Sequence, residues 1–221
     1  MSMEINRFIE QTNLKPTLVD KDIDILVAEA KEYQFVGVCL PSFWVKRAAR
    51  EICDEDIQLV TVIGFPLGYQ RTESKLLEIE KAIDDGANEL DVVMNVSAFK
   101  TGMPWTKIEL AKCAKLAHDG EAMLKVIIET AYLNESEIIN ACKLVADAGA
   151  DFVKTSTGFA SEGAKTEHVQ LMRAHSPSNV GVKASGGIRD YNTAKAMIDA
   201  GADRLGVSAG VQIIEEFRQS I

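Results

Sequence analysis

The segment LVADAGADFVKTS (144–156) combines a helix end, a turn and a strand. Its first half has the apolar spacing of an amphipathic helix, Gly149 is a typical helix stop, and Phe152 and Val153 begin a short apolar strand. The segments AIDDGANELDVV (82–93) and MIDAGADRLGVS (197–208) follow the same order. A unit that recurs in this way indicates strands that alternate with helices around a parallel sheet.

The rest of the chain extends this alternation. Further strand-like runs lie at 35–40, 59–65, 122–130 and 180–185, with a short first strand near 10–14. Helical spacing is found at 74–83, 105–117, 136–148 and 192–200. About eight βα units in 221 residues predict an α/β fold, a single closed (β/α)8 TIM barrel domain over 1–221 with a short N-terminal helix. The alternative is an open doubly wound sheet, but its usual G-x-G-x-x-G after the first strand is absent.

Composition narrows the class of function. The chain is 47% hydrophobic and 26% charged, which is ordinary for a globular protein, and its net charge of −9 argues against a nucleic-acid surface. A local pocket can still attract a small anion. The four cysteines form no C-x-x-C pair and the three histidines have no ligand spacing, so no metal site is expected. Free thiols, no leader sequence and no apolar run of membrane length predict a cytoplasmic protein.

Ionisable residues occur where the predicted strands end. Counting five residues on from the glycine of each repeat gives Asp91, Lys154 and Gly206, and Lys183 lies near the end of the seventh strand. Because alternate barrel strands contribute to one interior layer, Asp91 and Lys154 are expected to point inward at a similar height. Lys125 is a third strand lysine, and a lone strand lysine is more often exposed. The convergence of Asp91, Lys154 and Lys183 predicts a functional cluster.

A lysine pair beside a carboxylate favours Schiff-base chemistry. Burial and a neighbouring cation both disfavour the ammonium form, so one lysine can leave the other as a free amine that attacks a carbonyl. Asp91 would then move protons. Position alone leaves open which lysine is the nucleophile, although the hydroxyls at 155–157 favour Lys154. This chemistry makes or breaks a carbon–carbon bond next to a carbonyl.

Two glycine-rich loops supply a candidate phosphate site. SGGI (185–188) and GVSAG (206–210) follow the seventh and eighth strands, which is the usual phosphate seat of such barrels. Gly158 offers another open N–H group, and Asp190 or Asn192 is expected to cap the following helix. The alternative is that these are ordinary turn glycines.

Several motifs resemble one enzyme family. They are TNLKP (12–16), VCLPSFW (38–44), GFPLG (64–68), LKVIIET (124–130), FVKTSTGF (152–159), VKASGGIR (182–189) and RLGVSAG (204–210). Together they resemble the deoxyribose-phosphate aldolases, which are class I, Schiff-base-forming lyases on a (β/α)8 barrel. The resemblance implies reversible cleavage of 2-deoxy-D-ribose 5-phosphate to D-glyceraldehyde 3-phosphate and acetaldehyde in carbohydrate degradation, with neither a metal nor an organic cofactor.

The resemblance also assigns roles. It implies Lys154 as the Schiff-base lysine, Lys183 as the lysine that perturbs it and joins the proton relay, and Asp91 as proton donor and acceptor. The phosphate contacts would be Gly158, Gly186, Gly187, Gly206 and Ser208. The pocket lining would include Thr12, Cys39 and Thr155, with Cys39 not a nucleophile.

Two stretches depart from the family pattern. The chain reads Glu10-Gln11-Thr12 where the family often has Asp-His-Thr, and 160–165 lacks the usual glycine-rich sequence. These changes are expected to affect acceptor-side contacts and loop mobility. The rival interpretations are a sugar-phosphate isomerase or another Schiff-base lyase, and a phosphosugar-binding regulator without catalysis. The partners expected are small phosphosugars and aldehydes, with no nucleic acid and no membrane, and a homodimer or higher homo-oligomer stays open.

Overall fold

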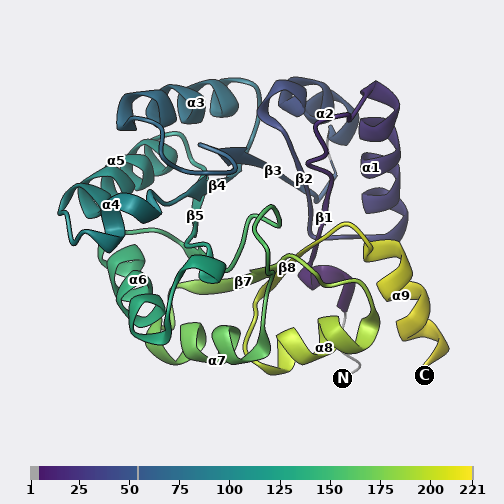
Figure 1. Ribbon diagram of the computed structural model, residues 1–221. Helices are drawn as coiled ribbons and strands as arrows, with labels where there is room; N and C mark the ends of the chain where they lie inside the picture. The colour runs from purple at the N-terminus through teal and green to yellow at the C-terminus, as the bar shows by residue number, and fades with distance from the viewer. Residues whose placement is uncertain (1–4, 54, 221) are drawn as a thin grey trace.

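Eight parallel strands form a closed barrel in the computed structural model, which describes residues 5–53 and 55–220 (Figure 1). Each strand pairs with the next in the chain, and the eighth pairs back with the first. The strands are β1 (Ile9–Thr12), β2 (Gly37–Leu40), β3 (Gln58–Ile63), β4 (Glu89–Val93), β5 (Met123–Ile127), β6 (Phe152–Lys154), β7 (Gly181–Ser185) and β8 (Arg204–Val207). The predicted (β/α)8 barrel is confirmed, and the open sheet is excluded.

Helices surround the barrel on its outer face (Figure 1). They are α1 (Asp20–Tyr33), α2 (Val45–Ile52), α3 (Thr72–Asp84), α4 (Val96–Lys100), α5 (Trp105–Asp119), α6 (Glu135–Asp147), α7 (Thr166–His175), α8 (Tyr191–Asp199) and α9 (Gly210–Gln219), with 3-10 turns η1 (Ile5–Phe8), η2 (Ser42–Trp44) and η3 (Thr130–Tyr132). The predicted N-terminal helix is the turn η1. Residues 1–4, 54 and 221 of the expected domain lie outside the described residues. Over the described part of the chain, no helix combines the length and apolarity that a membrane span requires.

The repeat glycines end helices as the sequence predicts. Gly86, Gly149 and Gly201 follow α3, α6 and α8 with φ values of 109°, 83° and 106°. This left-handed region is strained for residues with a side chain, so glycine allows the chain to turn directly into the next strand. The three turns lead into β4, β6 and β8.

The main hydrophobic core lies between the strands and the helices. Leu90 and Val92 of β4 belong to it, whereas Asp91 between them points the opposite way, into the barrel. Inside the barrel the apolar group is small and consists of Cys39, Val60 and Val62, with Leu14 and Phe65 packed against it. The remainder of the interior is therefore available for charged side chains.

The register places the interior side chains in layers of four from alternate strands. Following the pairing around the barrel, with a shift of about two residues for every second strand, one layer contains Cys39, Asp91, Lys154 and Gly206. The adjacent layer, further from the C-terminal ends of the strands, contains Glu10, Val60, Lys125 and Lys183. Two neighbouring layers thus bring most of the buried charge together.

Candidate active site

A group of six ionisable side chains fills much of the barrel interior, and we refer to it as the charged cluster. None of its members is more than 3% exposed. The members are Glu10, Glu89, Asp91, Lys125, Lys154 and Lys183. Charges buried this deeply require close partners, because desolvation strongly disfavours an isolated ion. Three carboxylates and three lysines can supply those partners to one another.

Asp91 lies at the centre of the charged cluster. Its Oδ2 accepts hydrogen bonds from Lys154 Nζ at 2.6 Å and Lys183 Nζ at 2.7 Å, and its Oδ1 accepts one from Lys125 Nζ at 3.1 Å. Burial by itself raises the pKa of the Asp91 carboxyl, but the three lysines outweigh it and hold this pKa well below the usual range. Asp91 is therefore ionised at neutral pH.

Lys183 has a second carboxylate partner. Its Nζ contacts Glu10 as well as Asp91, and burial, which lowers its pKa, is outweighed by these two carboxylates, so the pKa of Lys183 is raised. Lys183 is thus a cation at neutral pH, and its nitrogen shares one oxygen of Asp91 with Lys154. The predicted neighbouring cation is present. Asp91 was expected beside the two lysines, whereas the Glu10 carboxylate did not enter the sequence argument.

Backbone positions explain how the lysines come together. Lys154 ends the three-residue strand β6 and pairs in register with Lys183 of β7. Gly206 lies within β8, where an added Cβ would come within 3.2 Å of Lys183 Cε and 3.1 Å of Ser185 Cβ. The absence of a side chain at Gly206 therefore leaves the space that the Lys183 side chain occupies.

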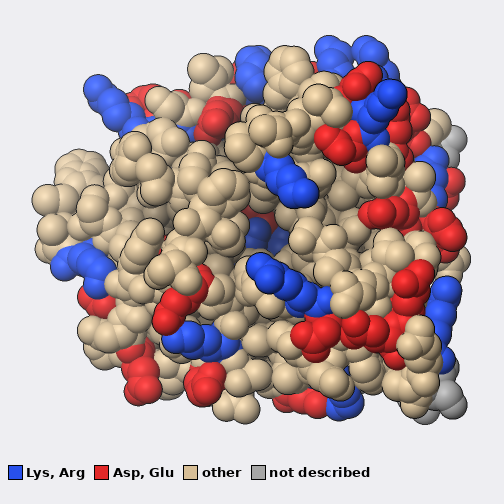
Figure 2. Space-filling model, turned by 45° about the vertical axis from the view of Figure 1, so that its right-hand side comes forward, with Lys and Arg blue, Asp and Glu red and all other residues tan. Residues whose placement is uncertain are grey.

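A pocket of about 420 Å³ opens above Lys154 at the C-terminal ends of the strands, and we call it the mouth pocket. Its lining includes Lys154, Lys15 and Arg189, and no Asp or Glu among the described residues lines it. The space-filling view shows a hollow with basic side chains at its rim and interior on this otherwise acidic protein (Figure 2). The mouth pocket thus suits an anionic ligand.

The predicted phosphate residues border this pocket. Gly158, Gly186, Gly187, Gly206 and Ser208 all line it. Within the described residues, the N–H groups of Gly158, Gly187 and Ser208 donate to no protein acceptor, so they remain open to a ligand. Asp190 accepts a hydrogen bond from Thr193 N at 2.8 Å and caps α8, which is one of the two caps predicted. The loop amides, rather than the end of α8, are the available donors.

The predicted pocket residues have different surroundings. Thr12 lines the mouth pocket. The Thr155 hydroxyl donates to Ser185 O at 3.1 Å and accepts from Ser185 N at 3.0 Å, so it lies in the barrel wall. Cys39 is fully buried beside the charged cluster, and burial raises the pKa of its thiol to about 11. The Cys39 thiol therefore stays protonated at neutral pH, as expected of a residue that is not a nucleophile.

The departure at 10–12 affects two different faces of β1. Glu10 points into the barrel and contacts Lys183, whereas Gln11 points outward. Gln11 donates to Glu29 of α1 at 2.7 Å and accepts from Gly210 N of α9 at 3.0 Å. Only the change at Glu10 therefore reaches the charged cluster.

Sequence reasoning missed three members of the charged cluster. Lys125 was set aside, and Glu10 and Glu89 were given no role in it. Yet Lys125 contacts Asp91 and Glu89 and lies 3.6 Å from Glu10. A signal for it was present, because Lys125 is the fifth residue after Gly120, the same spacing that located Asp91 and Lys154.

Comparisons with known proteins agree with this geometry. Residues 4–216 match the family model described as "DeoC/LacD family aldolase". The chain is 48% identical to the deoxyribose-phosphate aldolase of Thermococcus gammatolerans, covering 100% of this chain and 99% of that protein. It is 49% identical to the Brevibacillus brevis protein of the same name, covering 96% of each.

Solved structures give the same result. "QR15, an Aldolase" has a TM-score of 0.92 at 43% identity and covers 97% of this chain and 96% of its own. A tetrameric deoxyribose phosphate aldolase from Aeropyrum pernix has a TM-score of 0.91 at 33% identity and covers 98% of this chain and 92% of its own. The similarity thus spans the whole barrel, including every element that carries the charged cluster.

Proposed function

The chain belongs to the DeoC/LacD family of aldolases, and we propose that its single barrel domain reversibly cleaves 2-deoxy-D-ribose 5-phosphate to D-glyceraldehyde 3-phosphate and acetaldehyde. The observation that carries the proposal is the contact of Lys154 and Lys183 with one oxygen of Asp91 beneath a pocket lined by cations. That arrangement supplies an amine, a fixed cation and a proton carrier in one place.

In the proposed reaction, Lys154 Nζ adds to the C1 aldehyde of the open-chain sugar, and loss of water gives an iminium. The C3 hydroxyl then loses its proton and the C2–C3 bond breaks. Its electron pair passes into the iminium to form an enamine, and D-glyceraldehyde 3-phosphate leaves. Protonation of the enamine at C2 and hydrolysis release acetaldehyde and restore the amine. The iminium accepts the electrons, so the residues of this chain suffice.

Proton transfers are assigned to the neighbours of Lys154. Asp91 is within hydrogen-bonding distance of Lys154 and Lys183, so it can accept a proton from one step and return it in another. Lys183 holds a positive charge beside the reacting nitrogen. The phosphate would bind the open amides of Gly158, Gly187 and Ser208, which places the aldehyde end toward Lys154.

The test is covalent trapping combined with a coupled assay. Reduction with borohydride in the presence of acetaldehyde is expected to place an adduct on Lys154, located by peptide mass mapping, and Lys154→Ala is expected to abolish turnover while the fold survives. An adduct on Lys125 or Lys183 instead would overturn the assignment. Turnover of a phosphosugar without any adduct would favour an isomerase, and binding without turnover would favour a regulator.

The cellular setting and assembly belong to the same proposal. The four cysteines are unpaired, which supports a cytoplasmic location. The relative from Aeropyrum pernix is described as tetrameric, and we propose that this chain also forms a homo-oligomer. Sedimentation equilibrium tests this, since a monomer at assay concentration would contradict it.

A further inference from the structure

Glu129 is a buried carboxylate that the proposed reaction does not use. It follows β5, is 3% exposed, and has a φ of 53°, in the left-handed region that disfavours residues with a side chain. Such a conformation persists only where surrounding contacts hold it. The contacts of Glu129 therefore indicate what this position does.

Those contacts reach the loop that follows Lys154. Glu129 Oε2 accepts hydrogen bonds from Thr157 N at 3.1 Å and from the Thr157 hydroxyl. The same hydroxyl oxygen accepts from Phe159 N at 3.1 Å. Glu129 thus fixes both residues that flank Gly158, whose own N–H group points to no protein acceptor among the described residues.

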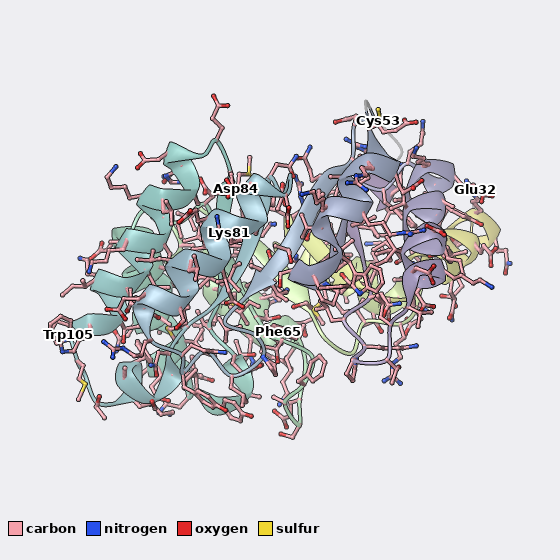
Figure 3. All side chains as sticks on the ribbon, turned by 90° about the horizontal axis from the view of Figure 1, so that it is seen from above. Glu32, Cys53, Phe65, Lys81, Asp84 and Trp105 are labelled. Atoms are coloured by element: carbon pink, nitrogen blue, oxygen red, sulfur yellow. The ribbon has the colours of Figure 1, made fainter. Side chains whose placement is uncertain are left out.

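The aromatic ring beyond Gly158 is fixed as well. Phe159 packs edge-on against Phe65 with ring centroids 5.2 Å apart. Viewed from above, Phe65 and Cys53 lie toward opposite ends of the barrel, with Phe65 at the end where the mouth pocket opens (Figure 3). The loop that Glu129 holds therefore forms one wall of that opening.

The other attachments of this loop lie near its two ends. Ser185 Oγ donates to Ser156 O at 2.7 Å, and Ala164 N lies 3.1 Å from Ser185 O and 3.0 Å from Gly186 O. Both attachments lead to β7 and the residue after it. Glu129, which follows β5, adds an attachment from the other side at Thr157, the residue before Gly158.

The loop that follows β6 touches the SGGI loop (185–188) at this point. A Cβ added to Gly186 would lie 3.5 Å from Gly158 Cα, so the two backbones are packed with little room between them. A shift of Thr157 would therefore move Gly158 relative to Gly186 and Gly187. An oxyanion that is bound by amides from both loops would lose part of its donor set.

We propose that Glu129 is a positioning residue that sets the enzyme's preference for a phosphorylated over an unphosphorylated sugar, by holding Thr157 so that the Gly158 amide faces the phosphate. This rests on the proposed aldolase function and adds to it a residue outside the reacting centre. Glu129 does not itself line the mouth pocket; it acts through Thr157, which does.

The experiment compares two substrates in each variant. The ratio of kcat/KM for 2-deoxy-D-ribose 5-phosphate to kcat/KM for 2-deoxy-D-ribose measures the phosphate preference, and acetaldehyde–borohydride trapping on Lys154 measures the covalent step separately. In Glu129→Ala, the Thr157 N–H loses its acceptor, and the ratio is expected to fall by about tenfold or more, with trapping close to wild type.

Glu129→Gln is the conservative variant and guards against misfolding of the alanine variant. Its amide oxygen can accept both Thr157 hydrogen bonds, and its NH2 group would replace Oε1, which has no partner among the described residues. The ratio is expected to stay within about threefold of wild type. Glu109→Gln is the matched control, since Glu109 is 5% exposed, pairs with Lys75 and touches neither phosphate loop; its ratio is expected to equal that of wild type.

The outcomes separate this proposal from the function on which it rests. A wild-type protein that neither turns over the phosphosugar nor traps acetaldehyde would contradict the aldolase function itself. If the wild type is active but Glu129→Ala lowers kcat/KM for both substrates by the same factor, or lowers neither value, the positioning role alone would be overturned. A fall in the ratio for Glu109→Gln would also overturn it, because the effect would then follow from general loosening of the fold.

Discussion

Replacing Asp91 by asparagine tests the electrostatic organisation of the barrel interior. The substitution keeps the side-chain shape but removes the charge that contacts Lys125, Lys154 and Lys183. Breaking a buried ion pair costs about 3 to 5 kcal/mol. A stranded lysine can instead release its proton at pH 7, which costs about 4 to 5 kcal/mol from an ordinary pKa of about 10.4. Both routes predict that Asp91→Asn lowers the free energy of unfolding by about 3 to 5 kcal/mol.

For a protein of this size, such a loss corresponds to a melting temperature about 6 to 20 °C lower. Activity is expected to fall by about a hundredfold or more, because the proton carrier beside Lys154 is lost. Urea unfolding at pH 7 measures the stability, and the coupled aldolase assay measures turnover. Lys154 has no carboxylate partner other than Asp91 among the described residues, so removing this cation in Asp91→Asn/Lys154→Met is expected to restore part of the stability but not the activity.

The difference in unfolding free energy between wild type and Asp91→Asn depends on pH in a direction that the pKa of Asp91 fixes. The pKa of Asp91 is lowered in the folded state, so its stabilisation is fully present above the unfolded value near 3.9 and is lost as pH falls through the folded value. If all three lysines stay charged in Asp91→Asn, the stability difference from wild type should stay constant from pH 8 to 5. If one lysine is neutral instead, the difference should widen by about 1.4 kcal/mol per pH unit as the pH falls. In both cases it should close only below about pH 3.9. Equal stability at pH 7, or a difference that closes above pH 5, would refute the assigned charges.

Four further outcomes follow from the same geometry. Asp91 and Glu10 raise the pKa of Lys183 against burial, so Glu10→Gln should move the alkaline limb of the kcat/KM profile to lower pH; an unmoved limb would contradict the Glu10 contact. Burial raises the pKa of Cys39 to about 11, so iodoacetamide at pH 7.5 should leave activity intact, as should Cys39→Ser to within about twofold. Gly206→Ala would place a Cβ 3.2 Å from Lys183 Cε, and the displaced lysine should lower kcat more than about tenfold at a stability cost of about 1 to 3 kcal/mol. Because the proposed electron sink is the iminium, a chelator should not change the rate, and loss of activity with recovery on adding a divalent metal would refute this.

The fold could be predicted from the sequence because the signals that end helices and begin strands recur regularly. Each repeat glycine ends a helix, and the apolar run that follows is a barrel strand even where β6 has only three residues. The same regularity located Asp91, Lys154 and Gly206 by counting. It also contained Lys125, which was set aside because a lone strand lysine is usually exposed.

The other contacts of the site form only when the barrel closes and its loops pack, so the sequence pattern does not reveal them. Glu10 precedes the first helix, so no repeat glycine marks its position, and its contact with Lys183 exists only because β1 pairs with β8 beside β7. The period of two along a strand would have placed Thr155 on the face opposite Lys154. The link between Glu129 and Thr157 joins two irregular segments, and no sequence periodicity encodes it.

Pairing of Ile9 with Leu205 has a consequence for biosynthesis. During translation β1 leaves the ribosome first, and its neighbour β8 follows only after the other strands have been made. Until then, β1 can pair only with β2. Contacts between such distant segments form slowly, so the last event in folding should be the same one that delivers Glu10 to the lysines. Aldolase activity is then expected to appear late and in one step. In a synchronised translation reaction, the time of the first detectable turnover would report when the barrel closes.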